Sequence, residues 1–318
     1  MKQEQMFNID VVITWVDGND PELGAKRAQY MQGNDSLQAD DIAGTTRYSD
    51  RGEIYWCVRS INKFMPWVHR IFIVTDGQDP KVESEIPVEI VDHKVIFRGY
   101  EHYLPTFNSL SIEAMLWRIP ELSEHFVYFN DDFMICKKVN KDMFFPKEGY
   151  IKCHGHKASL LWTKIRYFFK RLMGHACRVN HVQQMMDSAD IVGGSNSFIR
   201  LSHTPYPLLK STLQGFYESH PSLLAQNIRN RFRSTEHFRS DELVYMLLKK
   251  EGRLQVVPER DVLMEYMPHG GMERLERKLH RVTCQGSKVC FINFGSLDKA
   301  SDAIFSRITQ FVEELLKQ

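Results

Sequence analysis

Four short apolar segments of this chain each lead into an acidic or amide residue, and this pattern constrains the fold most strongly. The segments, each with the polar residue that follows it, are 9–16 (Asp17), 71–74 (Asp76), 85–91 (Asp92) and 125–129 (Asn130). Apolar residues at helical spacing lie between them, over 53–64 and 109–117. Strands that alternate with helices predict an open α/β sheet, mostly parallel, which binds its ligands beyond the carboxyl ends of the strands.

The alternation extends to about residue 150, and the rest of the chain shows more helical periodicity. We expect a helix followed by a loop in 22–45, and further helices at 158–173, 205–230, 240–250 and 297–316. We therefore divide the chain into an α/β half (1–150), a basic aromatic helical insertion (151–195) and a helical half (196–318). The three parts together are expected to form one composite domain with a single site.

The charge balance excludes a protein that coats nucleic acid. Lysine and arginine number 41 against 40 aspartates and glutamates, which gives a net charge of +1. No apolar run approaches the roughly 18 residues of a membrane-spanning helix, and the polar N-terminus is unlike a signal peptide. We therefore expect a cytoplasmic protein.

Asp131 and Asp132 follow directly after an apolar strand, and adjacent carboxylates at such a place are ligands for a hard divalent cation. Mg²⁺ or Mn²⁺ held there would neutralise a diphosphate. The alternative is a turn with two solvated aspartates.

Other candidates stand next to expected helix starts and strand ends. Asn108 or Ser109 begins a helix, where a phosphate can sit, although plain capping explains both residues. Glu113 lies about one turn into that helix and points either at the same cleft or at solvent. Thr14, Trp15 and Asp17 offer stacking and hydrogen bonds to a nucleotide base, or else Trp15 is a core residue before a tight turn.

His203 and Arg233 are candidates from the second half of the chain. His203 precedes an expected helix, where a histidine can act as a general base, and a surface histidine is the alternative. Arg233 stands in the sequence NRFRS, whose guanidinium groups suit phosphate, and a solvated basic turn is the alternative.

The segment 157–178 interleaves aromatic residues with Lys164, Arg166, Lys170 and Arg171. A helix of this composition can lie on an anionic membrane surface. We expect it instead to dock on the core as an ordinary amphipathic helix, with the membrane surface as the alternative.

Taken together, several strings in one order resemble the Stealth family of sugar-1-phosphate transferases. The resemblance spans about 9–135 closely and 198–250 more loosely. The matching strings are IDVVITWVDGNDP, RYSDRGEIYWCVRSI, PWVHRIFIVTDGQDP, IVDH, LPTFNSLSIE and YFNDDF, followed by LSHTPYPL and NRFRS. The C-terminal string CFINFGSLDKAS matches the family poorly, because it carries no acidic pair.

The resemblance implies a GT-A-like nucleotide-sugar-binding fold and an enzyme of capsular or cell-surface polysaccharide synthesis. Such an enzyme moves a sugar 1-phosphate from a nucleotide sugar, here a UDP-sugar, to a hydroxyl of a glycan acceptor that is free or lipid-linked. It implies catalytic roles for Glu113, Asp132, His203 and Arg233, with Arg239 as a competitor of Arg233 and with the base open between His203 and Asp132. The residues that we assign to the donor are Thr14, Trp15, Asp17, Arg59, Asp76, Asn108, Ser109 and Asn130, and those for the metal are Asp131 and Asp132.

Two other functions fit the same sequence. One is a metal-dependent glycosyltransferase that breaks the anomeric C–O bond, and the other is a non-catalytic glycan- or nucleotide-binding module.

Overall fold

The computed structural model describes residues 7–31, 51–173 and 180–317. Within these ranges the strands are β1 (Ile9–Thr14), β2 (Ile71–Thr75), β3 (Val88–Asp92), β4 (His125–Asn130), β5 (Phe133–Ile135), β6 (Ile151–Ser159), β7 (Ser197–Leu201), β8 (Tyr206–Leu209), β9 (Leu254–Val257), β10 (Leu263–Tyr266) and β11 (Phe291–Phe294). The helices are α1 (Pro21–Met31), α3 (Glu53–Phe64), α4 (His93–Ile96), α5 (Ser109–Glu113), α6 (Leu160–Leu172), α7 (His181–Val192), α8 (Lys210–Ser219), α9 (Pro221–Ile228), α10 (Ser240–Lys250), α11 (Gly271–Thr283) and α12 (Asp302–Lys317).

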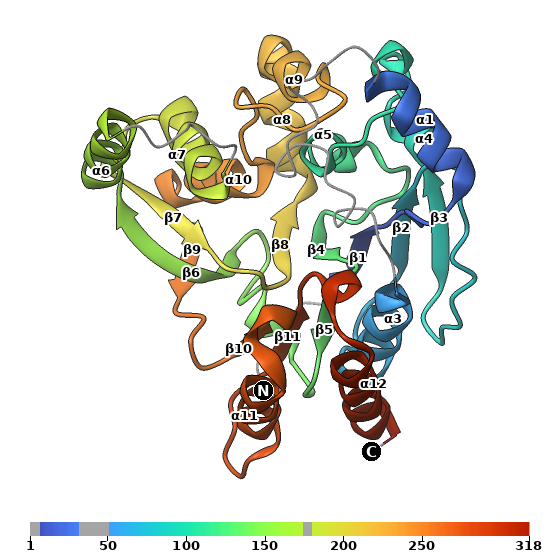
Figure 1. Ribbon diagram of the computed structural model, residues 1–318. Coiled ribbons are helices and arrows are strands. Elements are labelled where there is room, and N and C mark those ends of the chain that lie inside the picture. Colours follow the sequence, from blue (N-terminus) through green and yellow to red (C-terminus); the bar gives the residue numbers. More distant parts are fainter. Residues whose placement is uncertain (1–6, 32–50, 174–179, 318) are drawn as a thin grey trace.

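The main sheet has five strands in the order β3-β2-β1-β4-β8. The four strands expected from the sequence are parallel, and β8 joins them antiparallel to β4. Because helices cover this sheet (Figure 1), β1 and β2 are apolar and buried along nearly their whole length. The predicted α/β fold with an open, mostly parallel sheet is therefore confirmed.

Two smaller sheets of three strands complete the structure, in the orders β10-β11-β5 and β7-β6-β9. One large hydrophobic cluster contains residues from β1 through β11, including Ile9, Phe198 and Phe291. A second cluster packs α11 and α12 against β10 and β11, and includes Leu275 and Phe311. The chain after residue 196 is more helical than the part before it, as expected.

Two expected elements differ in the structure. Residues 205–230 begin with strand β8, because the apolar sequence YPLL pairs with β4 at the edge of the sheet, where Pro207 is tolerated. Residues 151–195 begin with the nine-residue strand β6 and only then form α6 and α7. Of the helix and loop expected in 22–45, α1 is present up to Met31, and residues 32–45 lie outside the described residues.

Helix α6 contradicts the expectation that it docks on the core. Leu161, Trp162, Phe168 and Phe169 are all exposed, and Leu160 at its first position is buried. In Figure 1 the helix lies at the outer end of the small sheet β7-β6-β9. Across the described ranges, no helix combines the length and the apolar character that crossing a bilayer requires.

Candidate active site

The carboxyl ends of the parallel strands meet at one edge of the main sheet. Thr14 at the end of β1 is level with Val74 on β2 and with Asn130 on β4. Thr75 at the end of β2 is level with Asp92 on β3. The loops that carry Asp17, Asp76 and Asp131 therefore begin at the same edge, as the alternation of strands and helices predicts.

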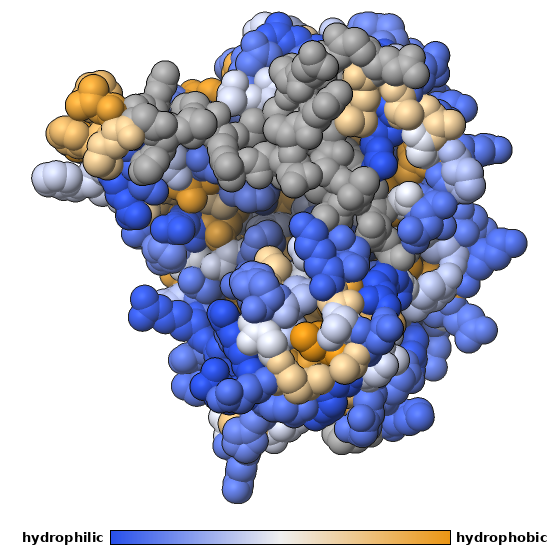
Figure 2. Space-filling model, in the orientation of Figure 1, coloured by the Kyte–Doolittle hydropathy of each residue, from blue (hydrophilic) through white to orange (hydrophobic). Residues whose placement is uncertain are grey.

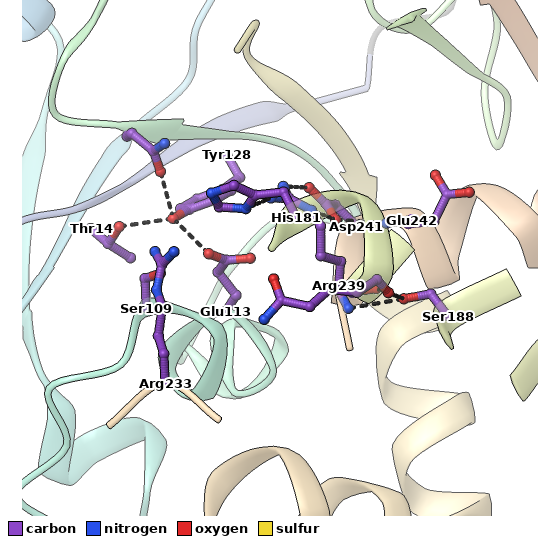
Figure 3. A network of polar contacts seen from close by, with 12 residues as sticks. Thr14, Ser109, Glu113, Tyr128, His181, Ser188, Arg233, Arg239, Asp241 and Glu242 are labelled. Atoms are coloured by element: carbon purple, nitrogen blue, oxygen red, sulfur yellow. Dashed lines mark hydrogen bonds and ion pairs between the residues drawn. The ribbon is translucent and has the colours of Figure 1, made fainter. Parts of the chain in front are cut away.

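Tyr128 connects the candidate residues at this edge (Figure 3). Its hydroxyl lies 2.9 Å from Thr14 Oγ1 and 2.9 Å from Asn130 Oδ1, and 3.4 Å from Glu113 Oε1. The sequence analysis missed this tyrosine. Tyr128 and Asn130 are two residues apart on β4 and so lie on one face of the sheet, which is the signal that identifies it.

Contacts between the segments before α5 and after α9 place Arg233 at the same site. The Phe107 backbone N–H donates to the Arg231 carbonyl at 2.8 Å, and the Phe107 and Phe232 rings stack with centroids 5.2 Å apart. Arg233 Nη2 then donates to Ser109 Oγ at 3.1 Å. In Figure 3 the Arg233 side chain rises beside Glu113, so the structure brings these two predicted residues together.

His203 reaches this edge through the loop between β7 and β8. Since β8 is antiparallel to β4, its first residue Tyr206 lies opposite Tyr128, close to the carboxyl end of β4. The His203 ring makes edge-to-face contacts with Phe133, at 6.3 Å, and with His181, at 6.2 Å. Phe133 directly follows Asp132, so His203 lies near the predicted metal ligands.

Burial lowers the pKa of His203 below its usual 6.5, and the positive charges of Arg239 and Arg233 lower it further. The imidazole is therefore neutral at pH 7. A neutral imidazole can accept a proton from a substrate. The nearby positive charges disfavour the protonated ring, so it can release that proton again.

Glu113 has the opposite shift. Burial raises the pKa of its carboxyl group from 4.5 to about 7, Arg239 and Arg233 lower it, and Asp241 raises it. Its Oε2 atom is buried and has no hydrogen-bond partner among the residues that the structure describes. A buried acceptor left open in this way suits a ligand hydroxyl.

Replacement of Glu113 by glutamine is expected to stabilise the protein at high pH. The folded-state pKa near 7 exceeds the unfolded value of 4.5, so the stability linked to this group is full below pH 4.5 and is lost as the pH rises through 7. Glutamine does not ionise, so at pH 8.5 the free energy of unfolding of the variant should exceed that of wild type by on the order of 2–3 kcal/mol. Urea unfolding of both proteins at pH 4.5 and pH 8.5 measures this; an equal difference at both pH values would contradict it.

Asp131 and Asp132, the predicted metal ligands, lie in the turn between β4 and β5. Asp132 Oδ1 is buried and has no hydrogen-bond partner within the described ranges. Burial raises the pKa of Asp132 from 3.8 to about 6, Asn293 lowers it, and Glu265 raises it. The described residues contain no group of three or more side chains that would hold a metal ion alone. Mg²⁺ often binds through one or two carboxylates together with substrate phosphates, so the pair fits a site that the substrate completes.

Asn293 links the C-terminal block to this pair. Its Nδ2 donates to the Asp132 backbone carbonyl at 3.4 Å, and β11, which carries it, pairs with β5 immediately after Asp132. The string CFINFGSLDKAS therefore supports the site through an amide, although it carries no acidic pair.

Arg239, the competitor of Arg233, is held inside the fold. Its guanidinium group forms a bidentate ion pair with Asp241, with Nε 2.9 Å from Oδ1 and Nη2 also bound to Oδ2, and both side chains are buried. Its backbone N–H donates to Ser188 Oγ at 2.9 Å. Arg239 is thereby committed to Asp241, and the geometry favours Arg233 as the group that meets a ligand.

Two predicted donor-binding residues, Trp15 and Asn108, are buried in the protein interior. Trp15 is only 7% exposed and belongs to the main hydrophobic cluster, so its ring offers no open surface for a base. Asn108 is buried, where its Oδ1 accepts the Leu110 N–H and its Nδ2 contacts Ser111 and His237. The alternatives of a core tryptophan and plain capping describe these two positions.

Three further predicted residues have no described contact with Tyr128 or with the residues around its hydroxyl. Arg59 on α3 forms a bidentate ion pair with Glu313 on α12, with contacts of 2.5 and 3.0 Å, and the structure does not show it in contact with the site. Asp17 is in the turn after β1, where Gln78 binds its backbone. Asp76 pairs with Lys26 on α1 at 3.2 Å.

Two conserved-region models of one protein family match the chain. Stealth conserved region 1 matches residues 7–35, and Stealth conserved region 2 matches residues 47–153. The capsular polysaccharide phosphotransferase cps1A of Actinobacillus pleuropneumoniae is 35% identical over 265 residues, which are 81% of this chain and 69% of that protein. The chain belongs to the Stealth family.

Two further relatives are also named as polysaccharide phosphotransferases. The capsular polysaccharide phosphotransferase LcbA of Neisseria meningitidis is 32% identical over 80% of this chain and 68% of that protein. The receptor polysaccharide phosphotransferase WefC of Streptococcus oralis is 31% identical over 72% of this chain and 74% of that protein. This Stealth protein is therefore an enzyme, a phosphotransferase.

Among solved structures, mouse xyloside xylosyltransferase 1 aligns over 91% of this chain and 98% of that one, with a TM-score of 0.43 and 9% sequence identity.

Proposed function

We propose that this Stealth enzyme transfers a sugar 1-phosphate from a UDP-sugar to a hydroxyl of a glycan acceptor in the synthesis of a capsular or other cell-surface polysaccharide, and releases UMP. The names of the relatives support the polymer class. The observation that carries the reaction type is the position of Arg233 beside Glu113 at the carboxyl edge of the sheet, with the neutral His203 near both arginines.

The chemistry assigns one task to each of these side chains. His203 accepts the proton of the acceptor hydroxyl, whose oxygen attacks the phosphorus next to the sugar. The bond from that phosphorus to the bridging oxygen breaks, and UMP leaves with the electron pair. Arg233 stabilises the negative charge on the transferring phosphoryl group, and Glu113 accepts a hydrogen bond from a sugar hydroxyl through its open Oε2.

Asp131 and Asp132 would hold Mg²⁺ or Mn²⁺, which when bound neutralises charge on the diphosphate of the donor. In the described part of the chain the pair belongs to no cluster of three or more His, Cys, Asp or Glu side chains. The site therefore depends on the donor for its remaining oxygen ligands, and metal and donor should bind together.

The identity of the released nucleotide tests the proposal. Purified enzyme is incubated with UDP-, CMP- and GDP-sugars, with Mg²⁺ or Mn²⁺ and with a glycan extract as acceptor. UMP from a UDP-sugar, together with a phosphodiester in the product, supports sugar-phosphate transfer. Release of UDP would mean an ordinary glycosyltransferase reaction at the anomeric carbon and would overturn the proposal.

A further inference from the structure

Helix α6 exposes a large apolar surface that the proposed reaction does not use. Figure 2 shows this surface as the orange group at the upper left, where α6 projects in Figure 1. The exposed side chains are between 54% and 72% accessible: Leu161, Trp162, Phe168, Phe169, Leu172 and Met173. Apolar side chains gathered on one helix and open to solvent mark an interaction site.

The apolar residues form one stripe that faces away from the protein. At about 100° of rotation per residue, the stripe occupies an arc of about 120°. Its members are Leu161, Trp162, Ile165, Phe168, Phe169 and Leu172. The opposite side of the helix carries Thr163, which donates to the Ser159 carbonyl at 2.7 Å, and Tyr167, which donates to Asn180 at 3.1 Å. The helix is therefore attached by its polar side and presents its apolar side outward.

Positive charges border this stripe on both margins. Arg166 and Lys170 follow it on one side, and Lys164, paired with Asp190 at 2.6 Å, follows it on the other. The sequence of α6, LLWTKIRYFFKRL, contains no aspartate or glutamate. An apolar stripe between cationic margins matches the acyl boundary and the phosphate groups of an anionic bilayer.

We propose that α6 is a peripheral membrane anchor that lies in the surface of an anionic bilayer with its apolar stripe among the lipids. A second copy of the chain is the poorer occupant. A two-fold contact through α6 places the cationic margins of one helix against those of the other, because each copy contributes the same surface. The bilayer accommodates the stripe and the cations together.

Sedimentation with vesicles tests the anchor in the 318-residue chain. Wild type should bind vesicles of phosphatidylcholine with about one third phosphatidylglycerol at least about tenfold more strongly than phosphatidylcholine alone. The double variant Arg166→Glu and Lys170→Glu should lose at least about thirtyfold in affinity for anionic vesicles. The double variant Trp162→Ser and Phe168→Ser should lose at least about tenfold.

A matched control is available on α11, where Arg274 and Arg277 are exposed on a helix whose apolar side is buried. The variant Arg274→Glu with Arg277→Glu changes the net charge equally and should bind vesicles as wild type does. An equal loss in this control would overturn the proposal, because binding would then follow net charge alone.

The fluorescence of Trp162 gives a second readout that does not depend on a disruptive variant. Trp162 is 72% exposed, whereas Trp15 and Trp56 are buried. Anionic vesicles should shift its emission to shorter wavelength, and Trp162→Phe should keep binding and lose the shift. Wild type that binds no vesicles, or that forms a dimer abolished by Trp162→Ser with Phe168→Ser, would overturn the anchor. Neither result bears on the proposed reaction, which needs no lipid in the assay.

Discussion

Replacement of His203 by alanine is expected to lower the rate of UMP release by about 10²–10⁴-fold. His203 is the proposed base because its imidazole is neutral at pH 7, with a pKa held below 6.5 by burial and by two arginines. His203 lies in the loop between β7 and β8 and makes edge-to-face ring contacts with Phe133 and His181, so the fold should persist without it. Initial rates at saturating donor, together with a thermal melt, measure the two effects separately.

His156 provides the matched control for this experiment. It lies on β6 as a half-exposed histidine, 3.5 Å from Glu259. Its replacement by alanine should leave the rate within about twofold of wild type, as for most surface substitutions. If His203→Ala kept wild-type rates as well, the base would have to be another group, and Asp132 would be the next to test.

Replacement of Arg233 by methionine is expected to lower the transfer rate by about 10³–10⁵-fold, the range for an arginine that stabilises a transferring phosphoryl group. The predicted loss in stability is small, because Arg233 is only partly buried and its guanidinium group donates a hydrogen bond to the neutral, partly buried hydroxyl of Ser109. Arg233→Lys should recover only part of the rate, since lysine lacks the planar pair of donors.

Replacement of Arg239 by methionine should mainly lower the stability of the protein, whereas the change at Arg233 should mainly lower the transfer rate. Arg239→Met leaves Asp241 buried without its cation, and the loss should be about 3–5 kcal/mol in unfolding free energy. Urea unfolding and initial rates, measured on both variants, distinguish a residue that acts in catalysis from one that stabilises the fold. If Arg239→Met were stable but inactive while Arg233→Met stayed active, Arg239 would be the catalytic arginine and the proposed assignment would be wrong.

The sequence predicts the parallel sheet well because buried strands and their polar ends leave a local signal. β1, β2 and β4 are buried apolar runs, and the polar residues at their ends follow from sheet geometry, whereas the edge strand β3 is half-exposed. Glu113 and Arg233 also come together as predicted, on the strength of family resemblance and not of local pattern.

The rest of the site depends on contacts that no local pattern encodes. Tyr128 reads as one more aromatic residue of a buried strand until Thr14 and Glu113 are placed around its hydroxyl. The ion pair of Arg239 with Asp241 favours Arg233 over Arg239 as the arginine that meets a ligand, and this pair forms only when α10 is folded. Helix α6 misleads for a related reason: periodicity identifies an apolar side, and it does not say whether that side points inward.

The distances along the chain between partners in the site have a consequence for assembly. Thr14 and Tyr128 are 114 residues apart, Ser109 and Arg233 are 124 apart, and Asn108 and His237 are 129 apart. Contacts this far apart in sequence close long loops and form late. Activity should consequently return after most of the secondary structure during refolding. A fragment that retained only the conserved region at 47–153 would lack the central strand β1 as well as Arg233 and His203, and would be catalytically silent.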